Sequence, residues 1–338
     1  MVASACAGPS GHEAAATTTT RARGTSEPAP ALPRHAARPV AVRVAPGADL
    51  SVVSCGTPGS CVIGSAGGRS YRLIGKSVTA LVPAVASPSP QGASWLSCAA
   101  GPLCAAAPGE NSVTLLEGPT WQAPTTLAGA QGITAVACAG GSFCIVIDGQ
   151  GNSYSYDGHG WSGNLGAWGA ASQISCTSPS FCMAAEGGPS VWDGHSWTRP
   201  GNADDQGQLN AVSCASAAFC VLADSSGNVV TWNGLGFSAP QSVASEPPGS
   251  GGDSSGLTGV SCPTPTFCRA VDSLGRVFAW DGTAWNAGTM LDPGHALSAV
   301  SCPSTWSCVA VDRSGRAFVA AGSGPFTRGP ASARQPVR

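Results

Sequence analysis

The stretch from Val260 to Trp285 reads V-S-C-P-T-P-T-F-C-R-A-V-D-S-L-G-R-V-F-A-W-D-G-T-A-W, and variants of it recur along the chain. Its most constant element is a pair of cysteines separated by five residues. Self-similarity at a period of about 40 residues is the mark of a repeat architecture. Seven pairs occur: Cys55 and Cys61, Cys98 and Cys104, Cys138 and Cys144, Cys176 and Cys182, Cys214 and Cys220, Cys262 and Cys268, and Cys302 and Cys308.

Each repeat has the pattern of four short strands joined by tight turns. The first strand ends at the first cysteine, and the second carries the second cysteine among apolar residues, as in Cys308–Val311. A D-x-x-G turn follows, in which glycine supplies the positive φ of a tight hairpin. The third strand ends in an aromatic residue before Asp-Gly or Asn-Gly, as at Trp280, which is a strong hairpin signal. No segment shows helical periodicity.

Four strands in about 40 residues are typical of one blade of a β-propeller. Apolar residues on both faces of the second strand favour stacked blades, because a sandwich would expose one face. We therefore predict an all-β, seven-bladed propeller with four antiparallel strands per blade; a linear β solenoid or two sandwiches are the alternatives. The predicted blades lie near residues 50–81, 94–127, 132–166, 171–199, 208–240, 256–290 and 297–328.

The first and last repeats depart from the pattern. Gly64 stands where the turn aspartate is expected, and Ala320 stands where the third strand ends in tryptophan elsewhere. The segment Pro39–Ala45 has the composition of a strand and is a candidate to complete the seventh or the first blade. The sequence alone does not decide how the ring closes.

The combination of S-C-x5-C, D-x-x-G and W-D-G-x-x-W resembles the tandem repeats of exported propeller proteins of high-GC actinobacteria. Its turns are also similar to those of Asp-box and WD-repeat propellers, although neither motif is matched strictly. The resemblance covers about residues 50–328 and implies a propeller fold and export. It implies no particular activity.

The spacing of the cysteines predicts one disulfide in each blade. A C-x5-C pair across a tight turn places its members opposite each other on adjacent strands, at a Cα separation of about 4.5–5.5 Å. Free core thiols and zinc are the alternatives, but zinc needs four converging ligands and the chain has only five histidines. We expect no metal site. Seven disulfides would require an oxidising compartment.

Cys6 is the one cysteine outside these pairs. The small residues before it resemble the end of a bacterial lipoprotein signal peptide, in which the cysteine is lipidated. No charged or apolar region precedes it here, so a stray cysteine in a leader is the alternative. We predict a disordered leader or tether at residues 1–40, the propeller at 41–328 and a disordered tail at 329–338.

Little in the sequence indicates catalysis. The G-x-S-x-G match at Gly252–Gly256 lies in a loose Pro- and Gly-rich insertion, without the strand and helix of a nucleophile elbow. Most carboxylates occupy turn positions, which leaves few for the carboxylate pair of a glycosidase. We predict no catalytic residues and no cofactor. The recurring tryptophans are expected to pack between blades or over hairpins, whereas Trp95, Trp168 and Trp306 are irregular and are candidates for exposed contacts.

Function in a propeller usually resides where the loops vary. The irregular connections from one repeat to the next are expected to emerge on the same face as the D-x-x-G turns. They are Val82–Ser94, Arg199–Gln208, Pro240–Gly256 and Asn286–His295. Their polar side chains form the candidate binding set: Arg199, Asp204, Asp205, Asp292 and His295.

We therefore predict a non-catalytic extracellular binding, interaction or sensor module at the cell envelope. A carbohydrate-binding or carbohydrate-active propeller is the alternative, and a structural envelope protein is the third. The net charge of −2 gives no basic field for nucleic acid. The expected partner is a protein or glycan at the cell surface, and the expected state is a monomer. No apolar run reaches the roughly 18–20 residues of a membrane helix, so the only expected membrane contact is the lipid on Cys6.

Overall fold

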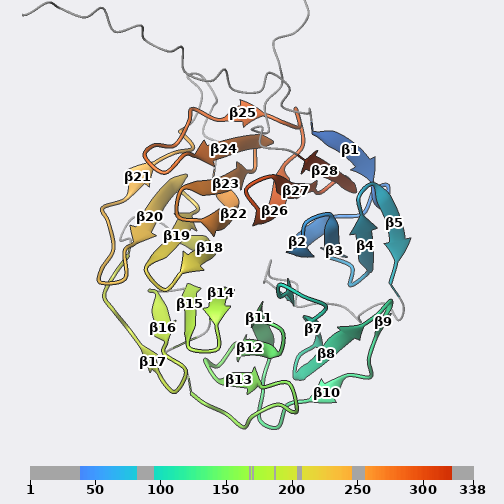
Figure 1. The fold of residues 1–338 in the computed structure, drawn as a ribbon, viewed down its shortest axis with the longest axis vertical. Helices are drawn as coiled ribbons and strands as arrows, with labels where there is room; N and C mark the ends of the chain where they lie inside the picture. The colour runs from blue at the N-terminus through green and yellow to red at the C-terminus, as the bar shows by residue number, and fades with distance from the viewer. Residues whose placement is uncertain are drawn as a thin grey trace, which may run out of the picture. The chain divides into compact units, whose positions relative to one another are not determined.

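The computed structural model describes residues 39–81, 95–166, 169, 171–185, 188–203, 208–245 and 256–321. These residues belong to one compact unit, His35–Arg338. They form seven antiparallel sheets that follow one another around a central axis (Figure 1). The seven-bladed propeller predicted from the repeats is confirmed.

The first four blades follow the order of the chain. Blade 1 contains β2 (Leu50–Thr57), β3 (Ser60–Ser65), β4 (Ser70–Ile74) and β5 (Ser77–Ala80). Blade 2 contains β6 (Leu96–Cys98), β7 (Cys104–Gly109), β8 (Ser112–Glu117), β9 (Thr120–Trp121) and β10 (Thr125–Thr126). Blade 3 contains β11 (Ile133–Ala139), β12 (Phe143–Asp148) and β13 (Ser153–Tyr156). Blade 4 contains β14 (Gln173–Ser178), β15 (Phe181–Ala185), β16 (Ser190–Trp192) and β17 (Trp197–Thr198).

The last three blades follow in the same way. Blade 5 contains β18 (Leu209–Ser216), β19 (Phe219–Asp224), β20 (Asn228–Trp232) and β21 (Gln241–Ser242). Blade 6 contains β22 (Leu257–Thr264), β23 (Phe267–Asp272), β24 (Arg276–Trp280) and β25 (Thr289–Met290). Blade 7 contains β26 (Leu297–Ser304), β27 (Ser307–Asp312), β28 (Arg316–Ala321) and β1 (Val40–Arg43).

The ring is closed by the N-terminal strand. β1 pairs antiparallel with β28, so that Val40 lies opposite Val319 and Arg43 opposite Arg316. In Figure 1 the blue β1 accordingly lies in the red blade. The segment Pro39–Ala45 therefore supplies the fourth strand of the seventh blade, which joins the two ends of the propeller.

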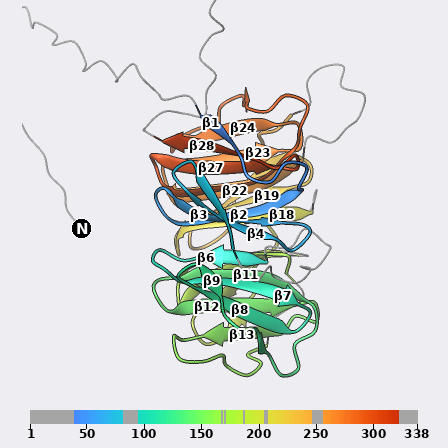
Figure 2. The ribbon, with the colours of Figure 1, turned by 90° about the vertical axis from the view of Figure 1, so that its right-hand side faces the viewer.

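The loops gather on two faces. Because the strands run from one side of the ring to the other (Figure 2), the two kinds of turn lie at opposite ends of each blade. We call the side with the D-x-x-G turns and the connections between blades the D-x-x-G face. The other side, which carries the five-residue loops between paired cysteines, is the cysteine-loop face. Of the four irregular connections, Asn286–His295 is described throughout and lies on the expected face, whereas Val82–Ser94 and parts of the other two lie outside the described residues.

All seven predicted disulfides are present, one in each blade. They join Cys55 to Cys61, Cys98 to Cys104, Cys138 to Cys144, Cys176 to Cys182, Cys214 to Cys220, Cys262 to Cys268, and Cys302 to Cys308. The pairing predicted from the C-x5-C spacing is therefore confirmed, and free core thiols and zinc are excluded for these fourteen cysteines.

The distances within the pairs differ from the expected ones. The Cα separations are 3.9–4.1 Å, shorter than the 4.5–5.5 Å that we expected for all seven pairs. In blade 3, Cys138 lies directly opposite Cys144, and the N–H of Cys138 points away from its partner strand. Cys61, Cys182 and Cys220 lie opposite their partners in the same way. Such non-hydrogen-bonded pairs have the closest Cα atoms in an antiparallel sheet.

The serine before the first cysteine ties each blade to the next. Its Oγ accepts the N–H of the first cysteine of the following blade, at 2.8–3.0 Å. Such bonds satisfy backbone groups on the innermost strand, which would otherwise be an open sheet edge. Six seams have this bond: Ser54–Cys98, Ser97–Cys138, Ser175–Cys214, Ser213–Cys262, Ser261–Cys302 and Ser301–Cys55. At the seam of blades 3 and 4 the corresponding residue is Ala137, which has no hydroxyl.

Candidate functional site

The turn aspartates predicted from D-x-x-G are buried structural groups. In each turn, Oδ1 accepts the N–H of the second and fourth following residues, and Oδ2 accepts a side-chain N–H of the fourth. The fourth residue is asparagine in blades 3 and 5 and arginine in blades 6 and 7. The four aspartates are Asp148, Asp224, Asp272 and Asp312, all at most 1% exposed.

The arginine of blade 7 builds the candidate site. Arg316 donates through Nε to Asp312 Oδ2 at 2.7 Å. Its Nη2 donates to both carboxylate oxygens of Asp292, at 2.8 and 2.7 Å, across the connection between blades 6 and 7. His295 lies on the same connection, with its Nδ1 3.6 Å from Asp292 Oδ1 and its side chain half-exposed. One guanidinium thus joins two carboxylates that come from different parts of the chain.

The pKa values of Asp292 and Asp312 are shifted in opposite directions. Burial, together with the neighbouring Asp312 carboxyl, raises the pKa of Asp292 to about 6 against the opposing effect of Arg316. Burial also acts on Asp312, but hydrogen bonds from Ser314 and Arg316 outweigh it and lower the pKa of that carboxyl. The two carboxylates therefore titrate as a coupled pair with separated pKa values.

The backbone holds the connection in place. Both Leu291 and Asp292 donate their N–H to the carbonyl of Gly275, the turn glycine of blade 6. A Cβ on Gly275 would come within 2.1 Å of Asp292 O, and φ is +83°, so only glycine fits there. The charged end of this connection is therefore fixed by the blade on each side of it.

Blade 6 contains an incomplete copy of the same arrangement. Arg276 donates through Nε to Asp272 Oδ2 at 2.6 Å and through Nη1 to Ser245 O at 3.0 Å. Ala244 occupies the position of Asp292, because it also donates its N–H to the turn glycine of its own blade. The Nη2 of Arg276 is buried and has no hydrogen-bond partner among the described residues.

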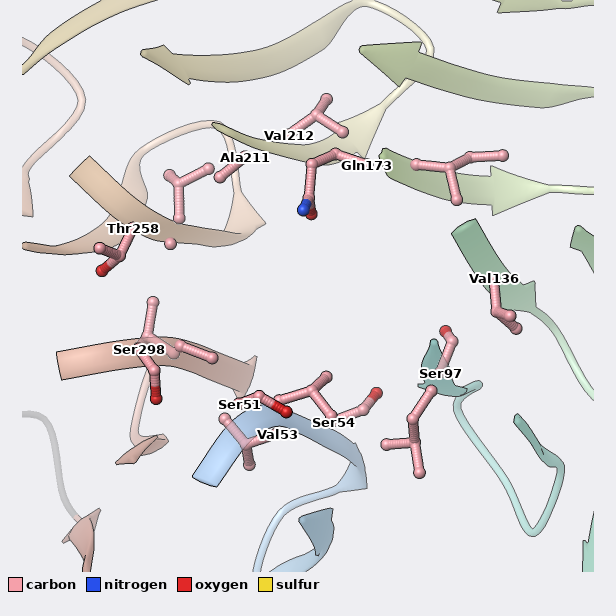
Figure 3. Close-up of a pocket in the computed structure, with 17 residues that line it drawn as sticks. Ser51, Val53, Ser54, Ser97, Val136, Gln173, Ala211, Val212, Thr258 and Ser298 are labelled. Atoms are coloured by element: carbon pink, nitrogen blue, oxygen red, sulfur yellow. The ribbon is translucent and has the colours of Figure 1, made fainter. Parts of the chain in front are cut away.

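The central channel has a different chemistry. It is a cavity of about 200 Å³ between the first strands of the blades (Figure 3). None of its lining residues is charged, and Gln173 points its amide into the space. The hydroxyls of Thr258 and Ser298 bond to backbone carbonyls of the next blade, Leu297 O and Leu50 O. The channel hydroxyls thus serve mainly to join blades, and the described lining supplies no carboxylate pair.

The structure brings together two of the predicted binding residues. Asp292 and His295 form one cluster, whereas Arg199 lies on the connection after blade 4, with its guanidinium beside Gly169. Asp204, Asp205, Cys6 and Trp168 lie outside the described residues. Sequence reasoning missed Asp312 and Arg316 as members of the cluster. The available signal was the arginine that follows the turn glycine in blades 6 and 7, in place of asparagine.

The aromatic residues mostly behave as expected. Pairs of rings lie over the outer hairpins of blades 3 to 6, with centroids 4.9–5.9 Å apart. In blades 4 to 6 the indole N–H of the first ring donates to a carbonyl in the cysteine loop. Trp306 is 51% exposed, as expected. The expectation for Trp95 is wrong: it is 2% exposed, because its ring lies over Gly64, where an aspartate would not leave room.

The cluster does not form a nucleophilic triad. The hydroxyl of Ser314 donates to Asp312 Oδ2 at 2.7 Å, and Asp292 and Asp312 are both engaged by Arg316. Among the described residues, no group of three or more His, Cys, Asp or Glu is arranged to hold a metal ion. In the same part of the chain, no helix has the length and hydropathy needed to cross a bilayer. The cluster presents to solvent the half-exposed imidazole of His295 and part of the guanidinium of Arg316, which its hydrogen bonds to Asp292 and Asp312 hold in place.

Comparison with known proteins supports the fold alone. No protein-family model and no curated protein matches the chain. Among solved structures, "YCF48 bound to D1 peptide" is similar with a TM-score of 0.64 at 13% identity, over 87% of this chain and 98% of that one. The WD40 repeats of RRP9 have a TM-score of 0.66 at 13% identity, over 84% and 97%. The Pan2 WD40 domain of Neurospora crassa has a TM-score of 0.60 at 14% identity, over 83% and 92%.

Proposed function

We propose that this protein is an exported, non-catalytic binding module that holds a protein partner on its D-x-x-G face. The proposal rests mainly on the Asp292–Arg316–His295 cluster, in which hydrogen bonds from blades 6 and 7 hold the ion pair of Asp292 and Arg316, with His295 half-exposed beside it. Fixed groups suit recognition because little side-chain entropy is lost on binding. The neighbouring Met290 is 39% exposed and adds an apolar contact. A protein partner fits this combination of apolar and polar groups.

The similar structures give the proposal some support. One of them, YCF48, is bound to a peptide, and another, BBS1N, is in complex with ARL6DN, so propellers of similar fold hold protein ligands in other chains. Fold alone does not determine function, and the identities of 10–14% carry no residue roles. The alternative of a carbohydrate-active propeller needs two carboxylates that face a substrate. Asp292 and Asp312 are at most 3% exposed and share Arg316 instead.

Photo-cross-linking from the two faces tests the binding proposal. A photoreactive residue replaces Met290 on the D-x-x-G face or, as the matched control, Leu235, which is 91% exposed on the cysteine-loop face. In the natively exported protein we expect a discrete cross-linked product from position 290, none from position 235, and a large loss on adding His295→Ala. Equal products from both positions, or none from 290, would contradict the proposal.

We further propose that the chain works in an oxidising, extracellular or cell-surface compartment, tethered by lipid on Cys6. Seven disulfides support the compartment. The proposed organisation is a leader that ends just before β1 (Val40–Arg43), at about the residue 40 expected from the sequence, then the propeller to residue 328 and a tail at 329–338. Intact mass of the native protein, before and after alkylation without reductant, should show fourteen protected cysteines and a diacylglycerol-sized increment. Fourteen alkylated cysteines would contradict export, and an unmodified Cys6 would contradict the tether.

A further inference from the structure

The seam of blades 1 and 2 contains a cavity on the cysteine-loop face. Its volume is about 340 Å³, which is within the range of small-molecule sites. Its lining includes Thr57, Ser60 and Arg72 of blade 1 and Gly101, Pro102 and Gly118 of blade 2. Both cysteine loops contribute exposed residues to this lining, so the cavity is open to solvent.

Two aromatic rings that fill other seams are absent here. Between blades 3 and 4, Phe143 precedes the second cysteine of its blade and packs in one core cluster with Trp192, which ends the third strand of the next blade. The next two seams have the same pair of rings: Phe181 with Trp232, and Phe219 with Trp280. At the seam of blades 1 and 2 these two positions are Ser60 and Leu116. Since protein interiors are otherwise closely packed, the loss of two rings accounts for the cavity.

The second ring of the blade 2 hairpin does not fill the space. Trp121 is 3% exposed, and its indole N–H donates to the hydroxyl of Ser70 in blade 1 at 2.8 Å. Trp197 of blade 4 makes the same bond to Ser153 of blade 3. Trp121 therefore keeps the regular place of the second ring, and the place of the first ring stays open.

The absent indole also leaves a carbonyl without its usual donor. In blades 4 to 6 the first ring donates its N–H to the third residue after the first cysteine: Pro179, Ala217 or Pro265. The corresponding residue of blade 2 is Gly101, whose carbonyl has no donor among the described residues. A Cβ on Gly56 would lie 3.1 Å from Gly101 O, so this carbonyl faces blade 1 across the seam.

Arg72 is the one charged residue in the described lining of the cavity. It lies opposite Val62, which packs against blade 2, so the guanidinium points across the seam, where Nη2 donates to Gly118 O. Arg72 takes part in none of the ion pairs of the described residues, although Glu117 adjoins Gly118. The same point of the third strand is uncharged in the other blades: Leu115, Ser155, Val191, Thr231, Ala279 and Val319.

The seam of blades 7 and 1 shows what small residues do without the arginine. Its two ring positions are Ser307 and Leu73, as small as those between blades 1 and 2. Val319 stands in place of Arg72 and packs against the core cluster that includes Leu73. Ser307 is 6% exposed. That seam is therefore closed by apolar contacts, whereas the seam of blades 1 and 2 combines an open space with a cation.

We propose that the cavity between blades 1 and 2 binds an aromatic carboxylate. The ring would occupy the space that aromatic side chains fill in other seams, and the carboxylate would bind the remaining N–H groups of Arg72. A carboxylate balances the single charge of Arg72, whereas a phosphate group would bring close to two negative charges. An indole N–H would find an acceptor in Gly101 O.

This chemistry occurs in two kinds of ligand. One is a free aromatic acid, and the other is the carboxyl terminus of a peptide that ends in an aromatic residue. Both would present a ring and a carboxylate a short distance apart. The site is on the face opposite the Asp292 cluster and does not depend on the function proposed for that cluster.

Isothermal titration calorimetry of the full chain with indole-3-propionate tests the proposal. The control ligands are propionate, which lacks the ring, and indole-3-propionamide, which lacks the charge. We expect saturable binding of indole-3-propionate, and binding of either control that is weaker by about tenfold or more. Acetyl-Gly-Gly-Trp with a free carboxylate distinguishes the sources, because it should bind more tightly than indole-3-propionate only if the site takes a peptide terminus.

Three variants locate the bound ligand. Arg72→Met should weaken binding by about tenfold or more, because it removes the charge and keeps the length of the side chain. Ser60→Phe introduces the ring that blades 3 to 6 have at this position and should abolish binding. Arg69→Met removes an exposed arginine from the D-x-x-G face of the same blade and should bind like wild type.

The fold of each variant is checked by its seven disulfides and its midpoint of thermal unfolding. No binding of either aromatic carboxylate, or equal binding of propionate or the amide, would overturn the proposal. Unchanged binding by R72M or S60F would also overturn it, because the ligand would then lie elsewhere. If S60F does not fold, R72M alone decides between these outcomes.

Discussion

At the scale of single residues, the seven repeats serve as controls for one another. Six seams have a serine hydroxyl that accepts the N–H of the next blade's first cysteine, and the seam after blade 3 has Ala137 instead. The comparison isolates one hydrogen bond in an otherwise constant setting. It also explains why the repeat motif begins with Ser-Cys.

Ala137→Ser should supply the seventh bond. A typical intramolecular hydrogen bond contributes about 0.5–1.5 kcal/mol, so the free energy of unfolding should rise by that amount. Ser213→Ala, which removes an existing bond of 2.9 Å, should lower it by a similar or larger amount. Denaturant titration of both variants measures the effect, and an unchanged or lower stability of A137S would contradict this account.

Gly64→Asp would restore the repeat motif and yet should destabilise the protein. A Cβ at position 64 would lie 2.3 Å from Cζ2 of Trp95, a buried ring that cannot move easily. Overpacking of this kind typically costs about 1–3 kcal/mol. The midpoint of thermal unfolding should therefore fall, and the double variant with Trp95→Ala should not show the clash. A more stable G64D protein would show that Trp95 has room to shift.

These residues also show what the sequence could predict. The cysteine pairs, turn aspartates and hairpin aromatics were readable because each repeats at a fixed place in most copies. Trp95 and the Arg316–Asp292 bond were not, because each depends on a contact between neighbouring blades that occurs once. The repeat period and the turn residues therefore predict the strands of each blade. The side chains that meet between two particular blades can be identified only from the three-dimensional structure.

At the scale of elements, the connection between blades 6 and 7 combines rigidity with a titratable group. The pKa of Asp292 is about 6, above its ordinary value of 3.8, mainly because the carboxyl is buried. Between about pH 4 and 6 the folded state thus binds the proton of the Asp292 carboxyl more tightly than the unfolded state does. The contribution of this carboxyl to the free energy of unfolding therefore falls as pH rises through that window. The pKa of Asp312 is lowered instead, so its ionisation affects the free energy of unfolding at pH values below this window.

The pH dependence is tested by measuring the free energy of unfolding of wild type and of Asp292→Asn across about pH 4 to 6.5, the window set by the raised pKa of Asp292. We expect wild type to lose stability relative to D292N as pH rises, because only wild type has to ionise the buried carboxyl. Denaturant unfolding at several pH values gives the difference directly. His295→Ala is the control for the contact with the neighbouring imidazole and should keep the dependence on Asp292. Parallel curves for wild type and D292N would contradict the raised pKa.

At the scale of the whole molecule, stability depends on the pairing of β1 with β28. Four residues at the N-terminal end of the described chain complete a sheet whose other strands come from the C-terminal end. Without β1, the outer edge of β28 and the residues packed below it, among them Val319, become exposed. The sheet edge and part of one core cluster are lost together.

A chain that begins at Pro39 should therefore unfold like the full chain, whereas one that begins at Ala45 should lose several kcal/mol, the usual scale for exposing a few buried side chains. Thermal unfolding of both chains, produced under oxidising conditions with all seven disulfides verified, makes the comparison. Equal midpoints would show that β1 contributes little to ring closure.

The closing strand also sets an order of events during synthesis. Each disulfide joins residues six positions apart, so it can form as soon as its own hairpin has emerged into an oxidising environment. The seventh blade cannot form until Arg316–Ala321 has emerged, and until then β1 has no partner strand. The nascent protein is thus a series of cross-linked hairpins with an unpaired strand at its leading end. Any factor that protects this strand would act before Arg316–Ala321 has emerged.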